Sequence, residues 1–373
     1  MSGGARAPLA CARCLRRRWL LAELSGPLDC CARDRARLLR TLALEDEQLI
    51  AALAGRRRQE LRAAYRRFRA GPSAQRCETV VCTHSHAFPQ QLRGEGAPRL
   101  LEVAGGLSRL RGLLAAPVVA ILGARRPSAY GVEVARELSR ALSASGVRVV
   151  AGVAGELAAG AHAGAREAGA GSVAVLGSGL GACRPATARA LAERVRERGC
   201  VVSELPRERH TRLWGQAASE RIVVGLCAAA VLVEADESPS ELAGARLALA
   251  CGRALGAVPG RVSARASAGP HALLREGASV IRGARDVLEL LGPLADAASP
   301  QIADGSRRSR VPSAAHRELL ERIGSGEDTP AQLLDAGADE GELLLALAEL
   351  ELCGALTRAA GGRYLLRGAL ADL

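Results

Sequence analysis

Short apolar runs alternate with longer amphipathic segments between residues 117 and 258, and this alternation constrains the fold more than any other feature. Apolar runs of this length are typical of strands buried on both faces, and each segment between them can hold one crossover helix. Right-handed crossovers then produce a parallel sheet. The pattern predicts a doubly wound α/β domain with strands at 117–123, 147–151, 172–176, 200–204, 229–234 and 254–258, and helices at 131–145, 157–168, 185–198 and 240–251.

A helical module is expected before this domain and a second compact unit after it. Residues 1–76 predict a SAM-like module of short helices at 15–24, 33–42, 45–53 and 56–69, followed by a linker. The α/β domain then covers residues 77–292, and a second linker covers residues 293–312. Residues 313–373 predict three helices and a hairpin around Gly361-Gly362, a pattern typical of a winged helix.

The formal charge of +12 favours a polyanionic partner. All 51 basic side chains are arginines, whose planar donor groups match phosphate and stack on nucleobases, so a nucleic acid is favoured over a small acidic metabolite. Biased genomic coding explains the absence of lysine equally well, but the net positive charge is the same under either explanation. The helix at 56–69 places Arg58, Arg62, Arg66 and Arg69 on one face, either against phosphate or, more commonly, as a solvated face.

Cysteine usage and the lack of long apolar runs predict a cytoplasmic protein. Eleven cysteines are scattered along the chain, and arginines interrupt the early apolar stretch that a secretory signal would need. The longest apolar stretches reach about ten residues, half of what a membrane span requires, so no membrane span is expected.

Four thiols near the N-terminus raise the question of a metal site. Cys11 and Cys14 have the Cys-x-x-Cys spacing of structural zinc sites, and Cys30 with Cys31 would complete a set of four ligands. An adjacent pair is an awkward ligand set, and cytosolic cysteines without a second Cys-x-x-Cys motif are more commonly small buried residues. The sequence therefore predicts neither a metal nor another cofactor.

The loops after the strands are the expected place for a ligand, because open parallel sheets bind ligands at the carboxyl ends of their strands. The loop at 123–131 has Gly123 and Ala124 near the ligand, Arg125 aimed into the crevice, and Ser128 as the N-cap of the next helix. Backbone amides at that helix start attract phosphate, and Arg125 would add a charge-assisted contact.

A second candidate phosphate loop follows the third strand. It contains Gly177, Ser178 and Gly179, with Arg184 nearby. Glycine-rich turns end strands of every kind, so an ordinary turn is the alternative. The Gly-x-Gly-x-x-Gly fingerprint of dinucleotide-binding domains is absent, which disfavours a nicotinamide or flavin cofactor.

The ordered set of motifs resembles the DNA-processing protein A (DprA, or Smf) family over about residues 80–292. The hydrophobic strand, Gly-x-Arg loop and Ser-x-Tyr-Gly at 118–131 are similar to one family motif, and Ala-Val-Leu-Gly-Ser-Gly-Leu at 174–180, followed by Pro185, is similar to another. Further similar segments, in the family's order, are 149–162, Arg221-Ile222, Gly225-Leu226, Val233-Glu234-Ala235, Gly252-Arg253, 257–260, Gly269 and 273–278.

This resemblance implies a non-enzymatic protein with an extended Rossmann-like domain that binds single-stranded DNA in a basic crevice. It also implies a homodimer formed through that domain, which protects incoming DNA during natural transformation, in competent cells, and loads the RecA recombinase on it. By position, Gly123 and Arg125 would grip phosphate, with Arg184 and Arg221 lining the same pocket. The implied DNA-binding residues are Gly123, Ala124, Arg125, Ser128, Gly177, Ser178, Gly179, Arg184 and Arg221.

Several polar positions of the family's motifs are changed in this chain. Glu156 replaces the glycine of a Gly-Ile-Asp motif, Ser219 and Glu220 replace an arginine and an asparagine, and Glu241 replaces the second serine of a Ser-Gly-Ser-Leu motif. His271 replaces an asparagine. Three glutamates lower the positive potential where phosphate would lie, so DNA affinity is expected to be weaker or relocated.

The alternative function is that of a degenerate Rossmann-fold nucleotide-binding protein or nucleotide-processing enzyme that no longer binds DNA. The phosphate loop of cytokinin-activating phosphoribohydrolases is not present, because Pro259-Gly260 is followed by Arg261. The six histidines form no Ser-His-Asp grouping, and His162 is expected to pack within the fold. The last long helix is acidic and leucine-rich, which favours a protein partner over duplex DNA for the final unit.

Overall fold

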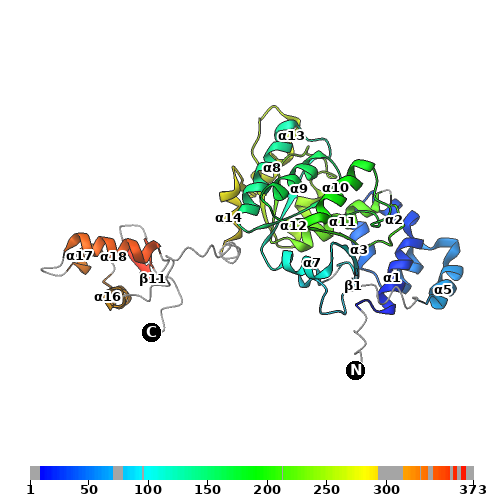
Figure 1. Ribbon diagram of the computed structural model, residues 1–373, viewed down its shortest axis with the longest axis horizontal. Coiled ribbons are helices and arrows are strands. Elements are labelled where there is room, and N and C mark those ends of the chain that lie inside the picture. The colour runs from blue at the N-terminus through cyan, green and yellow to red at the C-terminus, as the bar shows by residue number, and fades with distance from the viewer. Residues whose placement is uncertain are drawn as a thin grey trace, which may run out of the picture. The chain divides into compact units, whose positions relative to one another are not determined.

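The computed structural model describes residues 9–69, 79–94, 96–211, 213–292, 314–327, 329–334, 339–352, 356–358 and 363–366. The chain divides into two compact units, Met1–Pro300 and Gln301–Leu373, each of which is considered by itself. The first contains a nine-stranded sheet with helices packed on it (Figure 1). Among the described residues, no helix combines the length and the apolar character needed to cross a bilayer.

The nine-stranded sheet confirms the predicted doubly wound, mostly parallel arrangement. Its order is β1-β2-β6-β5-β4-β3-β7-β8-β9, and every pair from β6 to β9 is parallel. The strand order reverses beside β3, because the chain runs outward through β4, β5 and β6 and returns to add β7 on the other side. The parallel strands are β3 (Val118–Leu122), β4 (Arg148–Gly152), β5 (Val173–Val175), β6 (Cys200–Ser203), β7 (Ala229–Leu232), β8 (Ala254–Ala257) and β9 (Ser279–Val280).

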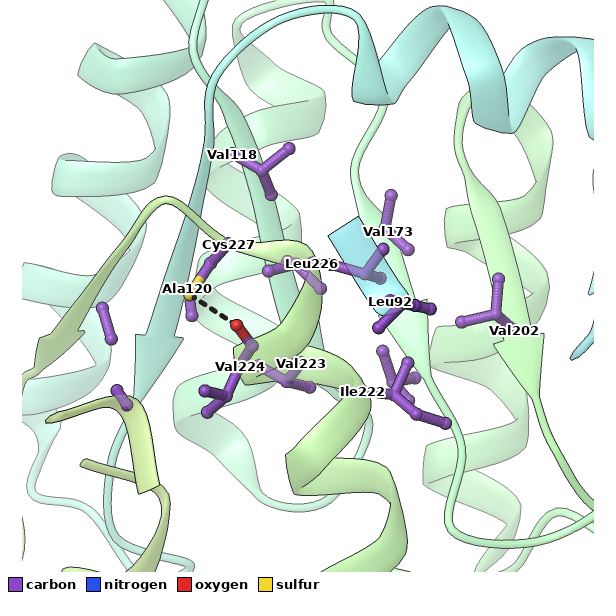
Figure 2. Close-up of a cluster of buried hydrophobic side chains, with 14 of the residues drawn as sticks. Leu92, Val118, Ala120, Val173, Val202, Ile222, Val223, Val224, Leu226 and Cys227 are labelled. Carbon is purple, nitrogen blue, oxygen red and sulfur yellow. Dashed lines mark hydrogen bonds between the residues drawn. The ribbon is translucent and has the colours of Figure 1, made fainter. Parts of the chain in front are cut away.

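Alternate residues of the central strands fill two hydrophobic layers. In β3, Val118 and Ala120 face one layer, whereas Val119 and Ile121 face the other. Figure 2 shows the first layer, where Ala120 of β3 lies beside Cys227, the residue after α11 (Trp214–Leu226). The helices that cover the first layer are α7 (Leu107–Leu114), α11 (Trp214–Leu226), α12 (Ala243–Ala250) and α13 (Arg265–Arg275). Those that cover the second layer are α8 (Ala129–Ala144), α9 (Glu156–Glu167) and α14 (Ala284–Leu291). The helix α10 (Ala186–Arg198) packs on β5 and β6.

An antiparallel edge and two helices of the α/β domain were not predicted from the sequence. β1 (Val80–Cys82) pairs with β2 (Leu100–Ala104), and β2 pairs with β6, both antiparallel. β2 contains the buried Glu102, which forms ion pairs with Arg18 and Arg207, so its sequence does not read as a continuous apolar run. The helices α7 and α11 were also missed, because both mix polar residues with their buried positions.

The N-terminal module contains α1 (Ala12–Glu23), α2 (Ser25–Cys31), α3 (Arg35–Ala43), α4 (Asp46–Leu53) and α5 (Arg58–Arg67). All but α2 were predicted. The core of the module contains Leu28, Leu38 and Ile50, and it continues into Leu205 and Trp214 of the α/β domain. The module therefore shares its core with α11 rather than standing apart.

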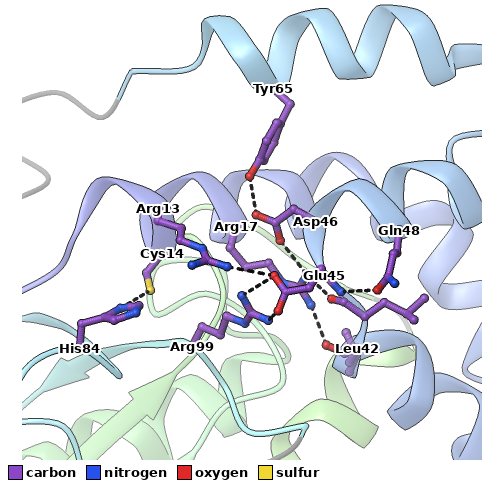
Figure 3. A network of polar contacts seen from close by, with 11 residues as sticks. Arg13, Cys14, Arg17, Leu42, Glu45, Asp46, Gln48, Tyr65, His84 and Arg99 are labelled. Carbon is purple, nitrogen blue, oxygen red and sulfur yellow. Dashed lines mark hydrogen bonds and ion pairs between the residues drawn. The ribbon is translucent and has the colours of Figure 1, made fainter.

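A buried polar network joins α1, α4 and α5 (Figure 3). The Arg17 guanidinium donates to the carbonyl oxygens of Leu42 and Leu44 at 2.6 and 2.7 Å and pairs with Asp46 at 2.7 Å. Asp46 also accepts a 2.6 Å hydrogen bond from the Tyr65 hydroxyl. Burial lowers the pKa of Arg17 and raises the pKa of Tyr65 to about 12.

The second unit contains the predicted three helices and hairpin. These are α16 (Ala314–Gly324), α17 (Pro330–Leu333) and α18 (Glu340–Leu352), followed by the antiparallel strands β10 (Leu356–Arg358) and β11 (Tyr364–Leu366). Thr329 forms a capping box with Gln332 at the start of α17, whose first residue is Pro330. The winged-helix assignment remains a prediction. The two predicted linkers and Gly361-Gly362 lie outside the described residues.

Candidate functional site

A cavity of about 310 Å³ opens at the carboxyl ends of β3, β4 and β5. This is the edge at which open parallel sheets bind their ligands. The β3 loop and the β5 loop, which are far apart in the sequence, meet at this edge. Of the nine residues that the sequence singles out, the cavity wall contains Gly123, Ala124, Arg125, Gly177, Ser178 and Arg184.

The cavity wall contains three side chains that can carry positive charge, Arg125, Arg184 and His210. All three are exposed. Within the described part of the chain, neither Arg125 nor Arg184 forms an ion pair. Both guanidinium groups therefore keep their full set of donors for an anionic ligand.

The three glutamates at positions 156, 220 and 241 lower the positive potential of the cavity less than the sequence suggests. Glu220 lines the cavity, but it is ion-paired with Arg35 of α3. Burial lowers the pKa of Arg35, and the nearby charge of Arg125 adds to this effect. Glu241 also lines the cavity and accepts a 2.8 Å hydrogen bond from the Asp236 amide, whereas Glu156 is exposed at the start of α9, outside the cavity wall. Arg35 thus offsets one of the three negative charges.

The N-terminus of α8 does not offer the phosphate site that the sequence predicts. The carboxylate of Glu234 accepts hydrogen bonds from the Ser128 amide at 2.8 Å and from the Ser128 hydroxyl at 2.6 Å. Ser128 also caps the helix by accepting from the Gly131 amide. A buried carboxylate already occupies this position, and it would repel phosphate. Ser128 lies outside the cavity wall.

Glu234→Gln is expected to destabilise the protein by about 1–3 kcal/mol, because an amide nitrogen would face one of the two donors of Ser128. Urea unfolding followed by circular dichroism would measure this loss. Glu133→Gln is the matched control, since Glu133 lies in α8, is 59% exposed and forms a surface ion pair with Arg136. Equal stability of the two variants would contradict the role of Glu234 in holding Ser128 at the start of α8.

Two other residues of the predicted site lie elsewhere. Arg221 forms an ion pair with the buried Glu204 and donates to the Gly96 carbonyl at 2.7 Å, and its side chain is only 8% exposed. This corrects the expectation that Arg221 lines the same pocket as Arg184. Gly179 donates to the Arg209 carbonyl at 2.8 Å, and a Cβ there would lie 1.9 Å from the Pro206 carbonyl oxygen. Gly179 therefore allows two loops to pack closely.

Cys183 and Thr211 line the cavity, and His162 lies near it, but each of these side chains is held in an unreactive state. Burial raises the pKa of the Cys183 thiol, which keeps it protonated. The Thr211 hydroxyl donates to the Gly177 carbonyl. His162 lies outside the wall, where its Nε2 donates to the Gly152 carbonyl at 3.0 Å and burial lowers its pKa to about 4. These three groups are therefore not available as a nucleophile or a general base.

Three contributors to the site were not anticipated from the sequence. His210 and Thr211 reach the cavity from the long connection between β6 and α11, and Arg35 reaches Glu220 from the N-terminal module. No local motif marks any of them. Only the packing of α3 against α11 brings Arg35 near Arg125.

The thiols at the N-terminus group differently from the set considered in the sequence. Cys31 is buried in the core of the helical module, and Cys30 is exposed. In the described part of the chain, Cys11 and Cys14 come together with Cys82 and His84.

The fold and the cavity define a Rossmann-like α/β protein with an arginine-bearing cleft at the carboxyl edge of its sheet. Residues 79–292 match the family of DNA recombination-mediator protein A. A protein of Mycobacterium tuberculosis (strain ATCC 25618 / H37Rv) named as a DNA processing protein DprA is 32% identical over 303 residues, which cover 78% of this chain and 74% of the relative. Protein Smf of Escherichia coli (strain K12) is 32% identical over 288 residues, 75% of each chain.

A solved structure shares the same fold. The X-ray structure of DprA from Streptococcus pneumoniae aligns with a TM-score of 0.60 and 23% sequence identity, over 75% of this chain and 98% of the other. The chain belongs to the DNA-processing protein A (DprA/Smf) family.

Proposed function

We propose that this protein binds single-stranded DNA in the cleft at the ends of β3, β4 and β5, without catalysing a reaction. The observation that carries the proposal is the pair of exposed arginines, Arg125 and Arg184, which line one cavity and have no ion-pair partner among the described residues. Two guanidinium groups on a common wall are suited to successive phosphates of one strand. Membership of a DNA-processing family supports nucleic acid as the ligand.

A single strand fits this site better than a duplex. The cavity is recessed and about 310 Å³ in volume, so it can admit one flexible backbone but not the side of a rigid double helix. Aromatic side chains make up 2% of the chain, so base stacking would depend on arginine planes and His210. Affinity is therefore expected to come mainly from phosphate contacts, with little base preference.

The cellular role that follows is the handling of incoming single-stranded DNA during natural transformation, in the cytoplasm. A homodimer formed through the Rossmann-like domain would present two clefts to one strand, and RecA recombinase is the expected recipient. The names of the relatives support DNA processing as the general role. A RecA filament assay on protected single strands would test the transfer step.

Fluorescence anisotropy of a labelled oligothymidine tests the proposal. Binding is expected to weaken with salt at a slope of about −0.7 in log K per log salt for each phosphate contact, so about −1.4 for two contacts. A duplex of equal length is the control and should bind more weakly. An absence of binding at low salt, together with binding of a free nucleoside phosphate, would instead favour the nucleotide-binding alternative.

A further inference from the structure

Three thiols and one imidazole converge where the N-terminal module meets the edge of the sheet. The donor atoms of Cys11, Cys14, Cys82 and His84 all lie within 4.8 Å of one another. Figure 3 shows the thiol of Cys14 directed at the His84 ring. We propose that these four side chains bind one zinc ion in a structural site.

The distances fit a tetrahedral centre. With Zn–S near 2.3 Å and Zn–N near 2.05 Å, a tetrahedron has S···N edges of about 3.6 Å and S···S edges of about 3.8 Å. Nδ1 of His84 lies 3.4 Å from Sγ of Cys11, 3.4 Å from Sγ of Cys14 and 3.9 Å from Sγ of Cys82. Closing the group around an ion requires a change of at most about 1 Å in its longest donor pair.

The surroundings suit a negatively charged metal centre. Cys11 is the N-cap of α1 and Cys14 lies in its first turn, so the positive end of the helix dipole faces the group. The Cys11 amide points at Sγ of Cys82 at 3.4 Å, a hydrogen bond that orients a metal-bound sulfur. Arg13 and Arg99 line a cavity together with His84. Both pair with Glu45, but the three side chains keep a net positive charge, which offsets the net negative charge of a zinc ion with three thiolates.

Four protein ligands leave no open position on a tetrahedral ion, which indicates a structural role. Cys14 and Cys82 are each 1% exposed and pack with Leu15, Val80 and Leu100. His84 is exposed, so it offers the path by which an ion can enter. The ion would tie the start of α1 to the end of the edge strand β1, next to the hydrogen bond from the Cys82 amide to the Leu9 carbonyl.

Metal analysis of the full-length chain tests this site. The protein would be purified under reducing conditions without a polyhistidine tag, and its metals counted by mass spectrometry. About one zinc ion per chain is expected in the wild type, and little in Cys11→Ser or His84→Ala, which alter the more accessible ligands. Cys30→Ser and Cys251→Ser are the controls, since both thiols are exposed and lie outside the group. Chelation should lower the Tm of the wild type by on the order of 5 °C.

Cobalt spectroscopy gives a second readout that does not depend on loss-of-ligand variants. Cobalt in the wild-type chain should show intense tetrahedral bands and thiolate-to-cobalt charge transfer. His84→Cys should strengthen the charge-transfer band by about one third, because four thiolates replace three. A wild-type protein that takes up neither zinc nor tetrahedral cobalt would overturn the proposal, as would equal loss of zinc in Cys30→Ser and Cys11→Ser.

Discussion

Replacing Arg125 and Arg184 together with alanine is expected to weaken oligothymidine binding by roughly 10²- to 10⁴-fold. Each guanidinium should contribute about 1.5–3 kcal/mol through charge-assisted hydrogen bonds to phosphate, so the pair contributes about 3–6 kcal/mol. Neither side chain has an ion-pair partner among the described residues, and both are exposed, so their removal leaves no buried group unsatisfied. The fold should therefore be unchanged while binding is lost.

The measurement is an anisotropy titration at low salt, repeated at several salt concentrations. Each single variant should reduce the salt slope by about 0.7, because one phosphate contact is removed. Arg126→Ala is the matched control: Arg126 is the exposed neighbour of Arg125 but lies outside the cavity wall. If Arg126→Ala reduced binding as much as Arg125→Ala, the positive charge of the loop would matter and the cleft would not. Unchanged binding in the double variant would remove the cleft model.

The central sheet could be predicted from the sequence because its strands are buried on both faces. β3 and β7 consist of apolar residues alone, so each can be recognised as a buried strand from its own sequence. The antiparallel edge had no such signal. Its strand β2 holds Glu102 in the interior by pairing it with Arg18 and Arg207, which lie 84 residues before it and 105 residues after it in the sequence.

The sequence predicted those site residues that lie in loops directly after the strands of the sheet. The loops with Arg125 and Arg184 follow strands, and the sheet topology brings them to one edge. The prediction that Arg221 lines the cavity was wrong because a sequence motif cannot show that its guanidinium forms an ion pair with Glu204. The zinc ligands illustrate the same difficulty. The spacing of Cys11 and Cys14 was visible, but Cys82 and His84 join them only after α1 packs on β1.

Asp46→Ala is expected to destabilise the first unit by about 3–5 kcal/mol, because it leaves the Arg17 guanidinium buried without a counter-charge. The side chains of Arg17 and Asp46 are 5% and 8% exposed, so water cannot replace the lost carboxylate without opening the module. The Tyr65 hydroxyl would lose its acceptor as well. Urea unfolding followed by circular dichroism and by tryptophan fluorescence would measure the change, since Trp214 lies in the shared core.

Glu47→Ala is the control for the loss of an acidic side chain from the same helix. Glu47 pairs with Arg62 at 2.8 Å, but its side chain is 52% exposed, so its removal should cost at most about 1 kcal/mol. Tyr65→Phe isolates the hydroxyl and should cost about 1 kcal/mol. The double variant Arg17→Met/Asp46→Leu should recover part of the stability, because it removes the isolated charge together with its partner. A loss in Asp46→Ala no larger than that in Glu47→Ala would show that the buried pair does not hold the helices of the module together.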